Sequence, residues 1–404
     1  MAHGGDQQLP PVRPPRGRRA SRAVAWVGIA VASLLVAAVL TGYAAYREVF
    51  GKIHHVHVTD LGKRPAKFNK SLNILVIGSD SRRGKNAKFG PHISGQRSDT
   101  IMVLHLSPGR KHAIVLSIPR DSVVPVLPCA RAPGAPGQSA QPGQVEQINA
   151  TFALGGPACL WKTIEQTTHL RLDHFAELNF TGFEHVINDL GGVNICLPYA
   201  ISDPRSNLHL ARGRHHVWGA EALAYWRVRY IGLGSDLERI QRDQYLMASL
   251  AQKVKQTNLF GDPAKVYKVV SDVASSLTTD SGLNQGMLIS LATSLRNLKL
   301  SEVHFIQVPT VAYPQNKDWV QWAPQASTLF SAIAHDRKPP KSDKDKGRSA
   351  SPAATASSAK PAPKRSTASS PPALRHLTKN FGGISAGANV CHDSGAFFGP
   401  LGGH

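Results

Sequence analysis

The stretch that decides the fold of this chain is residues 72–82, LNILVIGSDSR. Its first part is almost entirely apolar and ends at Gly78, which predicts a short buried strand followed by a turn. Asp80 and Arg82 come directly after that glycine. The stretch therefore predicts a strand inside a hydrophobic core that carries a carboxylate and a guanidinium at its end.

Similar apolar runs alternate with helical patterns along the next 230 or so residues. Strands are predicted over 100–106, 113–118, 175–180, 193–197 and 303–308, with a hairpin-like link at 107–111. Helices are predicted over 156–169, 181–190, 221–226, 235–255, 263–277 and 285–298, two of them opened by capping boxes at 181–184 and 235–238. This alternation predicts an α/β fold, an α/β/α sandwich with a central mixed sheet.

Composition divides the chain into six segments. We expect a basic cytoplasmic arm over 1–23, a transmembrane anchor over 24–46, a stalk over 47–70, a globular domain over 71–310 and a segment that ends it over 311–335. From residue 336 to 404 the chain is low in complexity and basic. Within it, 338–373 is rich in Lys, Pro, Ala and Ser and cannot bury a core, so we expect a disordered tail.

The segment 24–46 is uncharged and mostly aliphatic. As a helix it is about 35 Å long, enough to cross a bilayer. Five arginines precede it: Arg13, Arg16, Arg18, Arg19 and Arg22. The positive-inside rule then places the N-terminus in the cytoplasm and the rest of this single-pass protein outside the cell membrane. A cleaved signal peptide is the alternative, although the apolar run is longer than a typical signal core.

The chain has a formal net charge of +21 and a pI near 10.1. A balance this basic favours anionic partners, whether nucleic acid, acidic lipid or a phosphate-rich polymer. The predicted anchor favours the last two, because it holds the basic domain on the side of the membrane away from DNA. We therefore expect no nucleic-acid partner.

Four cysteines are consistent with export to an oxidising compartment. Cys129 and Cys159 flank a Pro-, Gly- and Gln-rich loop, and a disulfide that closes this loop is expected to stabilise it. Cys196 follows a predicted strand and is expected to be a small buried apolar residue. Cys391 lies in the tail, and no Cys/His spacing typical of a zinc site occurs.

Arginines and carboxylates recur together where the predicted strands begin or end. Arg97 and Asp99 precede the strand 100–106, and Arg120 and Asp121 follow the strand 113–118. The fork of a guanidinium suits phosphate oxygens, and paired carboxylates such as Asp80 and Asp99 can hold a divalent cation. The pattern points to pyrophosphate chemistry. In the alternative, Asp80 caps a turn and Asp99 pairs with Arg97.

Four more arginines lie on either side of residue 235. Arg227 and Arg229 share a face if the helix ends near residue 226 and the chain continues extended. Arg239 and Arg242 lie three residues apart near the positive end of the next helix, where a bound anion explains a cation better than the helix does. The alternative is a solvated helix face paired to Glu238 and Asp243.

These motifs together resemble the LytR-CpsA-Psr family of bacterial cell-wall enzymes. The resemblance covers about 72–255, and the anchor, proline-rich tail and composition are similar to actinobacterial members. It is carried by these segments: GSDSR at 78–82, RSDT at 97–100, SIPRD at 117–121, GGV at 191–193 and ALAYWRVR at 222–229. Their order and spacing are specific. One departure is Asp243, since the family usually has glutamine there; in this chain Gln244 stands beside it.

The resemblance implies a magnesium-dependent phosphotransferase. Such an enzyme moves a glycopolymer (teichoic acid, arabinogalactan or another glycan) from a polyprenyl-pyrophosphate carrier to peptidoglycan and forms a phosphodiester. Asp80 and Asp99 then match the Mg²⁺ ligands, and the pyrophosphate-gripping positions are Arg97, Arg120, Arg227, Arg229 and Arg239. Arg82, Arg242 and Gln244 are further substrate-binding candidates. The alternative is a non-catalytic protein that binds polyprenyl phosphate or wall polymer.

The same chemistry follows from the residues. Arginines and Mg²⁺ lower the barrier to attack on a pyrophosphate by stabilising charge on the transferring phosphoryl group. Asp121 or Asp99 is a candidate base for the acceptor hydroxyl. A polyprenyl chain needs a dry groove, for which the sequence offers Leu160, Ile164, Phe175, Phe183, Val186 and Ile187. Apolar residues at this spacing are also typical of plain core.

Overall fold

The computed structural model describes residues 17–59, 61–79, 98–132, 144–197, 199–228, 236–257, 263–337 and 383–387. The chain separates into two compact units, Met1–Gly51 and Lys52–His404. The first contains the helix α1, Gly17–Phe50. Within α1, the segment Trp26–Ala44 is 19 residues long, exposed, and apolar enough to cross a membrane. It falls inside the predicted anchor at 24–46.

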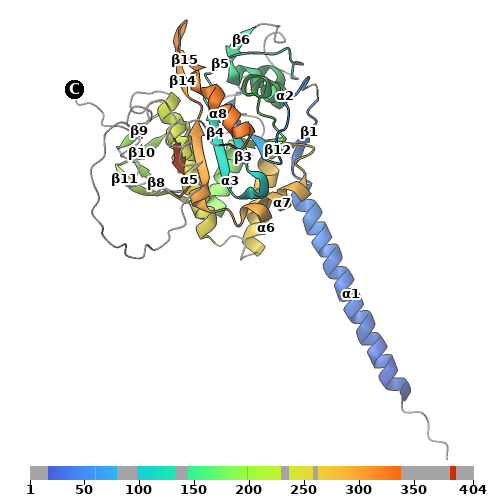
Figure 1. The fold of residues 1–404 in the computed structure, drawn as a ribbon. Coiled ribbons are helices and arrows are strands. Elements are labelled where there is room, and N and C mark those ends of the chain that lie inside the picture. Colours follow the sequence, from blue (N-terminus) through green and yellow to red (C-terminus); the bar gives the residue numbers. More distant parts are fainter. Residues whose placement is uncertain are drawn as a thin grey trace, which may run out of the picture. The chain divides into compact units, whose positions relative to one another are not determined.

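The second unit is built on one eight-stranded sheet in the order β1-β12-β7-β2-β3-β4-β13-β16 (Figure 1). Its strand β2 pairs with β3 antiparallel and with β7 parallel, so the sheet is mixed, as predicted. The strands are β1 His54–Val56, β12 Leu277–Asp280, β7 His174–Asn179, β2 Leu72–Ser79, β3 Ser98–Leu106, β4 Ala113–Ile118, β13 Val303–Gln307 and β16 Gly383–Ser385.

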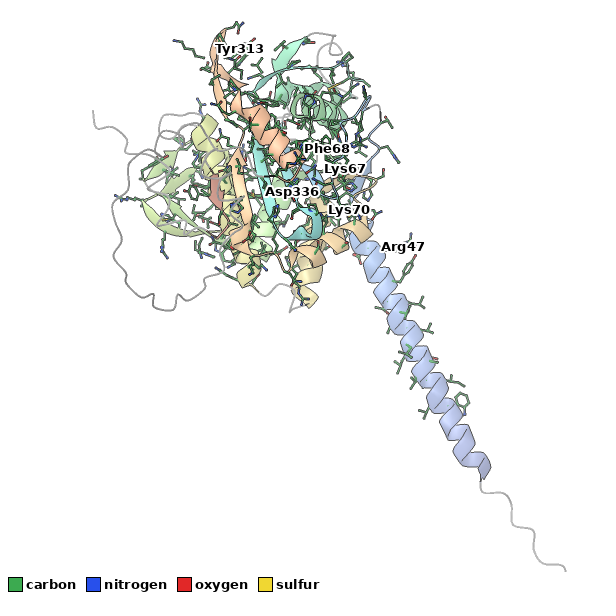
Figure 2. All side chains as sticks on the ribbon, in the orientation of Figure 1. Arg47, Lys67, Phe68, Lys70, Tyr313 and Asp336 are labelled. Carbon is green, nitrogen blue, oxygen red and sulfur yellow. A yellow bond between two sulfur atoms is a disulfide. The ribbon has the colours of Figure 1, made fainter. Side chains whose placement is uncertain are left out.

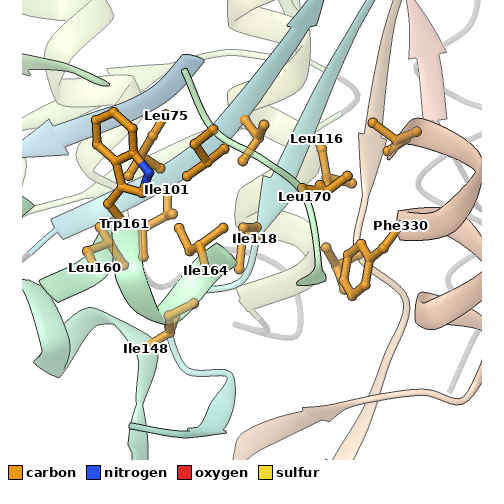
Figure 3. Close-up of a cluster of buried hydrophobic side chains, with 14 of the residues drawn as sticks. Leu75, Ile101, Leu116, Ile118, Ile148, Leu160, Trp161, Ile164, Leu170 and Phe330 are labelled. Carbon is orange, nitrogen blue, oxygen red and sulfur yellow. The ribbon is translucent and has the colours of Figure 1, made fainter. Parts of the chain in front are cut away.

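Helices cover both faces of this sheet, which confirms the predicted α/β/α sandwich. One face packs against α2, Ile148–Thr168, and α8, Gln325–Ala334. The other packs against α5, Asp236–Gln256, and α7, Gln285–Leu295. Figure 3 shows the first of these interfaces, in which Trp161 and Ile164 of α2 meet Leu75 and Ile101 of the sheet.

Helices on both faces of the sheet explain why the stretch at 72–79 is apolar at nearly every position. Leu75 and Ile77 belong to the cluster under α2 and α8. Leu72 and Ile74 belong to the cluster under α7. Successive side chains of a strand point to opposite faces, so a strand between two helical layers must be apolar on both.

A smaller group of elements extends the layer on the α5 side. Here α3, Phe180–Asp189, and α4, Gly219–Arg227, share a core with two short strand pairs. The pairs are β8 Val193–Leu197 with β11 Gly213–Val217, and β9 Ile201–Asp203 with β10 Leu208–Leu210.

The remaining elements are β5 Val123–Pro125, β6 Val145–Gln147, β14 Thr310–Tyr313, β15 Asn316–Trp322, α6 Pro263–Ser276 and the 3-10 turns η2 Pro108–Arg110 and η4 Leu300–Glu302.

Two glycines end α3 as the sequence predicted. Gly191 and Gly192 have φ of 77° and 75°, a region that side chains with a Cβ rarely adopt. A Cβ at Gly192 would also lie 2.4 Å from the ring of His216. The pair therefore turns the chain directly into β8.

Several local predictions differ from the structure. The cap of α3 is Asn179, whose side chain accepts a hydrogen bond from the backbone of Gly182 at 2.9 Å; the predicted capping box at 181–184 is wrong by two residues. Helix α2 begins at Ile148 rather than 156, with a break at Gly156, where φ is 67°. The predicted start thus marks the break, since glycine interrupts the helical pattern there.

The sheet also takes strands from segments whose composition gave no strand signal. β1 lies within the expected stalk and pairs with β12, and β16 lies within the expected tail and pairs with β13. Three-residue edge strands are too short to show a period of two, which is why the sequence pattern misses them. The rest of the predicted tail, 338–382 and 388–404, lies outside the described residues.

The predicted disulfide between Cys129 and Cys159 is present, with the two Cα atoms 5.5 Å apart. It ties the start of the 131–144 loop to α2. Cys196 is disulfide-bonded as well. The prediction of a free, buried Cys196 thiol is therefore wrong. A cysteine in a strand carries no local signal that distinguishes a bridged sulfur from a packed one.

A buried ion pair fastens the segment before β2 to α2. Arg64 donates to both carboxylate oxygens of Glu165, from Nε at 2.9 Å and from Nη2 at 2.6 Å. Glu165 is 1% exposed and also accepts from the backbone of Leu172 at 2.8 Å. The guanidinium lies over the ring of Trp161, 5.3 Å from its centroid. This contact fixes the entry of the chain into the sheet.

Replacing Glu165 by alanine is expected to destabilise the folded domain by about 3 kcal/mol, because Arg64 and the Leu172 amide then lose their buried acceptor. Urea unfolding followed by tryptophan fluorescence measures the loss. The control is Glu221→Ala, which removes an exposed carboxylate from the first turn of α4 and is expected to cost less than about 1 kcal/mol. Equal losses in the two variants would contradict this assignment.

Candidate active site

The site lies at the edge of the sheet where β2 and β4 end and β3 begins. Ser79 of β2 stands opposite Ser98 of β3, and the register shifts between Gly78 and Ser79. This antiparallel pairing brings the end of β2 to the same edge as Asp99. Asp80, Arg82 and Arg97 themselves lie outside the described residues, so their assignment stays a prediction.

A short chain of hydrogen bonds runs along this edge. Arg120 donates from Nη1 to Oδ1 of Asp99 at 2.6 Å and from Nε to Oδ2 of Asp121 at 3.3 Å. Gln147, at the end of β6, donates to the other oxygen of Asp121 at 2.9 Å. The guanidinium thus bridges the carboxylate of Asp99 on β3 and that of Asp121, which follows β4, as the clustering of these residues in the sequence suggested.

Asp121 is held on both sides by this chain of bonds. Because each of its oxygens accepts a hydrogen bond, the contacts suit a residue that positions Arg120 better than one that removes a proton. Asp99 also accepts a hydrogen bond from Arg120, and its side chain lines a pocket. It is 16% exposed and therefore reachable from solvent.

The pocket is formed by Gly78, Asp99, Thr100, Phe180, Trp226 and Arg227. Arg227, the last residue of α4, holds its guanidinium 5.3 Å from the centroid of the Phe180 ring. Trp226 packs on Phe183 at 4.5 Å between ring centroids. The pocket thus combines a cation, a carboxylate and two aromatic walls, which suits a ligand with a charged head and an apolar part.

Gly78 forms the floor of this pocket. A Cβ there would lie 3.1 Å from the side chain of Thr100 and 3.4 Å from the ring of Trp226. The glycine that marked the end of the predicted strand therefore has a second role, because it leaves room between β3 and α4. Helix α4 ends at residue 227, one residue later than predicted, and Val228 continues in an extended conformation.

Helix α5 contributes a guanidinium from behind this turn. Arg242 is 5% exposed and donates from Nη2 to the backbone oxygen of Val228 at 2.8 Å. It thereby positions the segment that carries Arg227. Its Nε and Nη1 have no hydrogen-bond partner within the described part of the chain.

The two residues after Arg242 are also buried. Gln244 donates to Oγ of Ser117 on β4 at 3.5 Å, which joins α5 to the sheet. Asp243 and Arg242 both act on the charge of the buried Tyr225. Burial raises the pKa of Tyr225, while Arg242 lowers it and Asp243 raises it further. Arg239 lies on α5 but its side chain, like Arg229, is outside the described residues.

Other buried donors near the pocket lack an acceptor in the described chain. They are the hydroxyls of Ser98 and Thr100 and the indole N–H of Trp226. A buried donor without an acceptor is costly, so a ligand oxygen that accepts from these groups would be stabilised here. Together with Arg242, they favour an anion at this edge.

Glu177 is a residue of this edge that sequence reasoning missed. It lies on β7 opposite Ile77, and its carboxyl hydrogen-bonds the Ser79 side chain. Burial raises the pKa of Glu177, and the hydrogen bond from Ser79 opposes this only in part. The signal was available, because a glutamate interrupts an otherwise apolar strand beside the predicted site.

The apolar residues expected to line one groove belong to separate packed clusters. Leu160, Ile164 and Phe175 lie under α2, whereas Phe183 and Ile187 lie in the core of α3 and α4. Val186 packs against a third cluster. The pocket wall consists instead of Phe180 and Trp226, which the helical spacing did not distinguish from core.

Comparison with known proteins gives a family match and several relatives. The model of the LytR_cpsA_psr family matches residues 41–333. The probable cell wall biosynthesis protein LcpB of Corynebacterium glutamicum is 34% identical over 230 residues, covering 55% of this chain and 52% of LcpB. LcpA of the same organism is 28% identical over 272 residues, covering 62% and 52%. The chain thus spans about half the length of these relatives.

More distant relatives include named transferases. The polyisoprenyl-teichoic acid–peptidoglycan teichoic acid transferase TagV of Bacillus subtilis is 25% identical over 269 residues, covering 64% of this chain and 63% of TagV. Among solved structures, the LytR-Csp2A-Psr enzyme from Actinomyces oris has a TM-score of 0.53 at 19% identity and covers 70% and 96% of the two chains. TagT bound to LI-WTA has a TM-score of 0.51 at 24% identity, covering 70% and 99%. These structures share the fold.

Glu177→Gln is expected to change how stability depends on pH. The raised pKa means that the folded state holds the proton more tightly, so the free energy of unfolding falls as the pH rises from the unfolded pKa through the folded one. Glutamine has no proton to lose there, so the variant gains stability over the wild type over the pH range that begins at the ordinary glutamate pKa of about 4.3. Urea midpoints measured across that range test this; a difference that is constant with pH contradicts it.

Proposed function

This chain belongs to the LytR-CpsA-Psr family, and we propose that it is a membrane-anchored phosphotransferase of the cell wall. In this proposal it transfers an anionic glycopolymer from a polyprenyl-pyrophosphate carrier to peptidoglycan and forms a phosphodiester. The names of its relatives support this, since TagV is a teichoic acid transferase that acts between a polyisoprenyl carrier and peptidoglycan.

The observation that carries the proposal is the pocket at the sheet edge. There Arg227 and Asp99 stand with Phe180 and Trp226 around one space, and Arg120 bonds Asp99 from behind. A pyrophosphate joined to a lipid needs this combination, a cationic cradle for the diphosphate and apolar walls for the first units of the chain.

The reaction follows from the charges. A hydroxyl of peptidoglycan attacks the phosphorus nearer the glycopolymer, a P–O bond to peptidoglycan forms, and the P–O–P bond breaks. Polyprenyl monophosphate leaves, and the hydroxyl proton passes to solvent or to an oxygen of the leaving phosphate. Arg227 and Arg120 stabilise the charge that spreads over the transferring group and the leaving oxygen.

The donor set at the edge fits a magnesium ion. Asp99 offers a carboxylate with one oxygen bonded to Arg120, and carboxylates with phosphate oxygens are the usual ligands of Mg²⁺. When bound, Mg²⁺ supplies neutralisation of the diphosphate charge. Asp99 and, in our prediction, Asp80 would hold it, while Arg120 keeps the Asp99 carboxylate in place.

The proposed location follows from α1. Its apolar segment at 26–44 is preceded by five arginines, so we propose a single pass with the N-terminus in the cytoplasm and the catalytic domain outside. The disulfide Cys129–Cys159 is consistent with that compartment, because disulfides persist where the environment is oxidising.

Arg227→Ala is expected to lower turnover at least about 100-fold, because one arginine that stabilises the transferring phosphoryl group contributes at least that factor. The measurement is release of polyprenyl phosphate from a polyprenyl-pyrophosphate-linked oligosaccharide by the full chain in detergent with Mg²⁺. Arg214→Ala, which removes an exposed arginine from β11, is the matched control and should keep full activity. Full activity of the Arg227 variant would refute the arginine assignment.

The same assay separates the enzyme from a non-catalytic binding protein. A receptor would retain the lipid tightly without releasing polyprenyl phosphate, whichever acceptor is supplied. Turnover that depends on peptidoglycan acceptor favours the transferase.

Asp99→Asn is expected to raise the Mg²⁺ concentration needed for half-maximal turnover by about tenfold or more, since an amide binds the ion more weakly than a carboxylate. It also leaves Arg120 with one carboxylate fewer. A Mg²⁺ titration of initial rates gives the shift, and Asp121→Asn is the comparison, because its oxygens bond Arg120 and Gln147. An unchanged Mg²⁺ requirement in Asp99→Asn would exclude that residue as a ligand.

A further inference from the structure

A second polar cluster lies at the other ends of the central strands, where β3 ends and β4 begins, away from the pocket. His105 is the last residue but one of β3, and His112 directly precedes β4. Asp336 follows α8 two residues after its end. One potential ligand atom from each of the three residues lies within 4.8 Å of the other two. Asp336 is more than 200 positions from both histidines in the sequence.

The hydrogen bonds of His105 fix which of its nitrogens carries a proton. Asn73 donates from Nδ2 to the backbone oxygen of Arg171 at 2.7 Å, so its Oδ1 is the acceptor that faces Nδ1 of His105, also at 2.7 Å. In the neutral ring, Nδ1 therefore holds the proton and Nε2 presents a lone pair. That lone pair faces Oδ1 of Asp336 at 3.5 Å.

The same carboxylate oxygen is 2.8 Å from Nε2 of His112. His105 is completely buried, and Asp336 is 22% exposed. Two acceptors that face each other in a buried place repel unless a cation lies between them. The cation is either a second proton on a ring or a metal ion.

Asp336 is an unexpected residue for its position in the backbone. Its φ is 52°, and the amides of Asp336 and Arg337 bond back to the oxygens of Ile333 and Ala332, which is the motif that usually carries glycine after a helix. A carboxylate is also disfavoured at the negative end of a helix.

We propose that Nε2 of His105, Nε2 of His112 and a carboxylate oxygen of Asp336 form a site for a divalent transition metal of the zinc class. Two imidazoles and one carboxylate are a ligand set typical of zinc, and they are too rich in nitrogen for Mg²⁺. Asn73 accepts a hydrogen bond from Nδ1 of His105. Acceptors placed in this way around metal-bound histidines fix the tautomer and orient the ring.

The geometry is close to what the ion requires. Zinc–nitrogen distances of about 2.0–2.1 Å place tetrahedral ligands about 3.4 Å apart. The His105–Asp336 pair at 3.5 Å already fits this spacing, and the His112–Asp336 pair at 2.8 Å has to open by about 0.6 Å. His112 and Asp336 are partly exposed and can move, whereas His105 is fixed. His304 lies nearby on β13, its two ring nitrogens buried and without a partner in the described residues.

Such a site would join the end of α8 to the start of β4. The same region holds Asn69, which donates to the oxygen of Ala334 at 3.1 Å, and Phe68, whose ring stacks on His335 at 4.1 Å. Figure 2 labels Asp336 and Phe68 in this part of the fold. The metal would therefore link α8 to the part of the sheet where β3 ends and β4 begins. This inference does not depend on the proposed function.

The test is zinc binding by the full chain in detergent, treated with a chelator, given excess Zn²⁺ and dialysed in the presence of Mg²⁺. Elemental analysis is expected to find about one equivalent of zinc retained per chain. His112→Gln and Asp336→Asn should lose that equivalent. His335→Gln is the matched control, since it removes a neighbouring histidine that lies outside the cluster, and it should retain the zinc.

A second measurement uses only the wild type, so it does not depend on how well the variants fold. Free Zn²⁺ at 100 times its dissociation constant lowers the unfolding constant of the wild type about 100-fold, which a rise in Tm reports. The absorption of Co²⁺ in the wild type shows whether histidines bind in a four-coordinate site. Wild-type protein that retains no zinc, or zinc retained equally by His112→Gln and Asp336→Asn, would overturn the proposal and leave a protonated histidine–carboxylate cluster.

Discussion

The antiparallel pairing of β2 with β3 is the constraint on which the site depends. Its register sets Gly78 beside Thr100 and Ser79 opposite Ser98, so the end of one strand and the start of the other meet at a single edge. β4 then pairs with β3 and brings Arg120 within 2.6 Å of Asp99. Because backbone hydrogen bonds fix the register, the charged groups are held in place before any ligand arrives, which lowers the cost of binding.

Burial on both faces is what makes this register secure. A shift by one residue would exchange Leu75 and Ile77 with Leu72 and Ile74 between two helical layers that differ in shape. The two layers also have different roles. The layer of α2 and α8 forms the largest core and holds the entry of the chain through Arg64 and Glu165. The layer of α4 and α5 supplies Arg227 and the buried Arg242 that positions it.

The two ends of the strands have different chemistry for a related reason. Helices that cover the faces leave the strand ends as the places where polar side chains can gather without crossing the core. One end collects arginines and carboxylates, which suits an anion with a hard cation. The other collects His105, His112 and Asp336, which suits a softer metal. Both clusters draw residues from several elements, so each is assembled only when the sheet forms.

The sequence by itself determined the sandwich, because apolar strands and amphipathic helices follow local periods that any reader of the chain can count. It also determined the apolar segment of α1, the Cys129–Cys159 bridge and the residues that cluster at the site edge, since Asp99, Arg120 and Arg227 stand next to strand or helix ends. Only the tertiary structure decided that Asn179 caps α3, that β1 and β16 join the sheet, and that Cys196 is bridged. It alone revealed Glu177, the wall of Phe180 and Trp226, and the histidine cluster, because these depend on contacts between residues far apart in the chain, which no local pattern encodes.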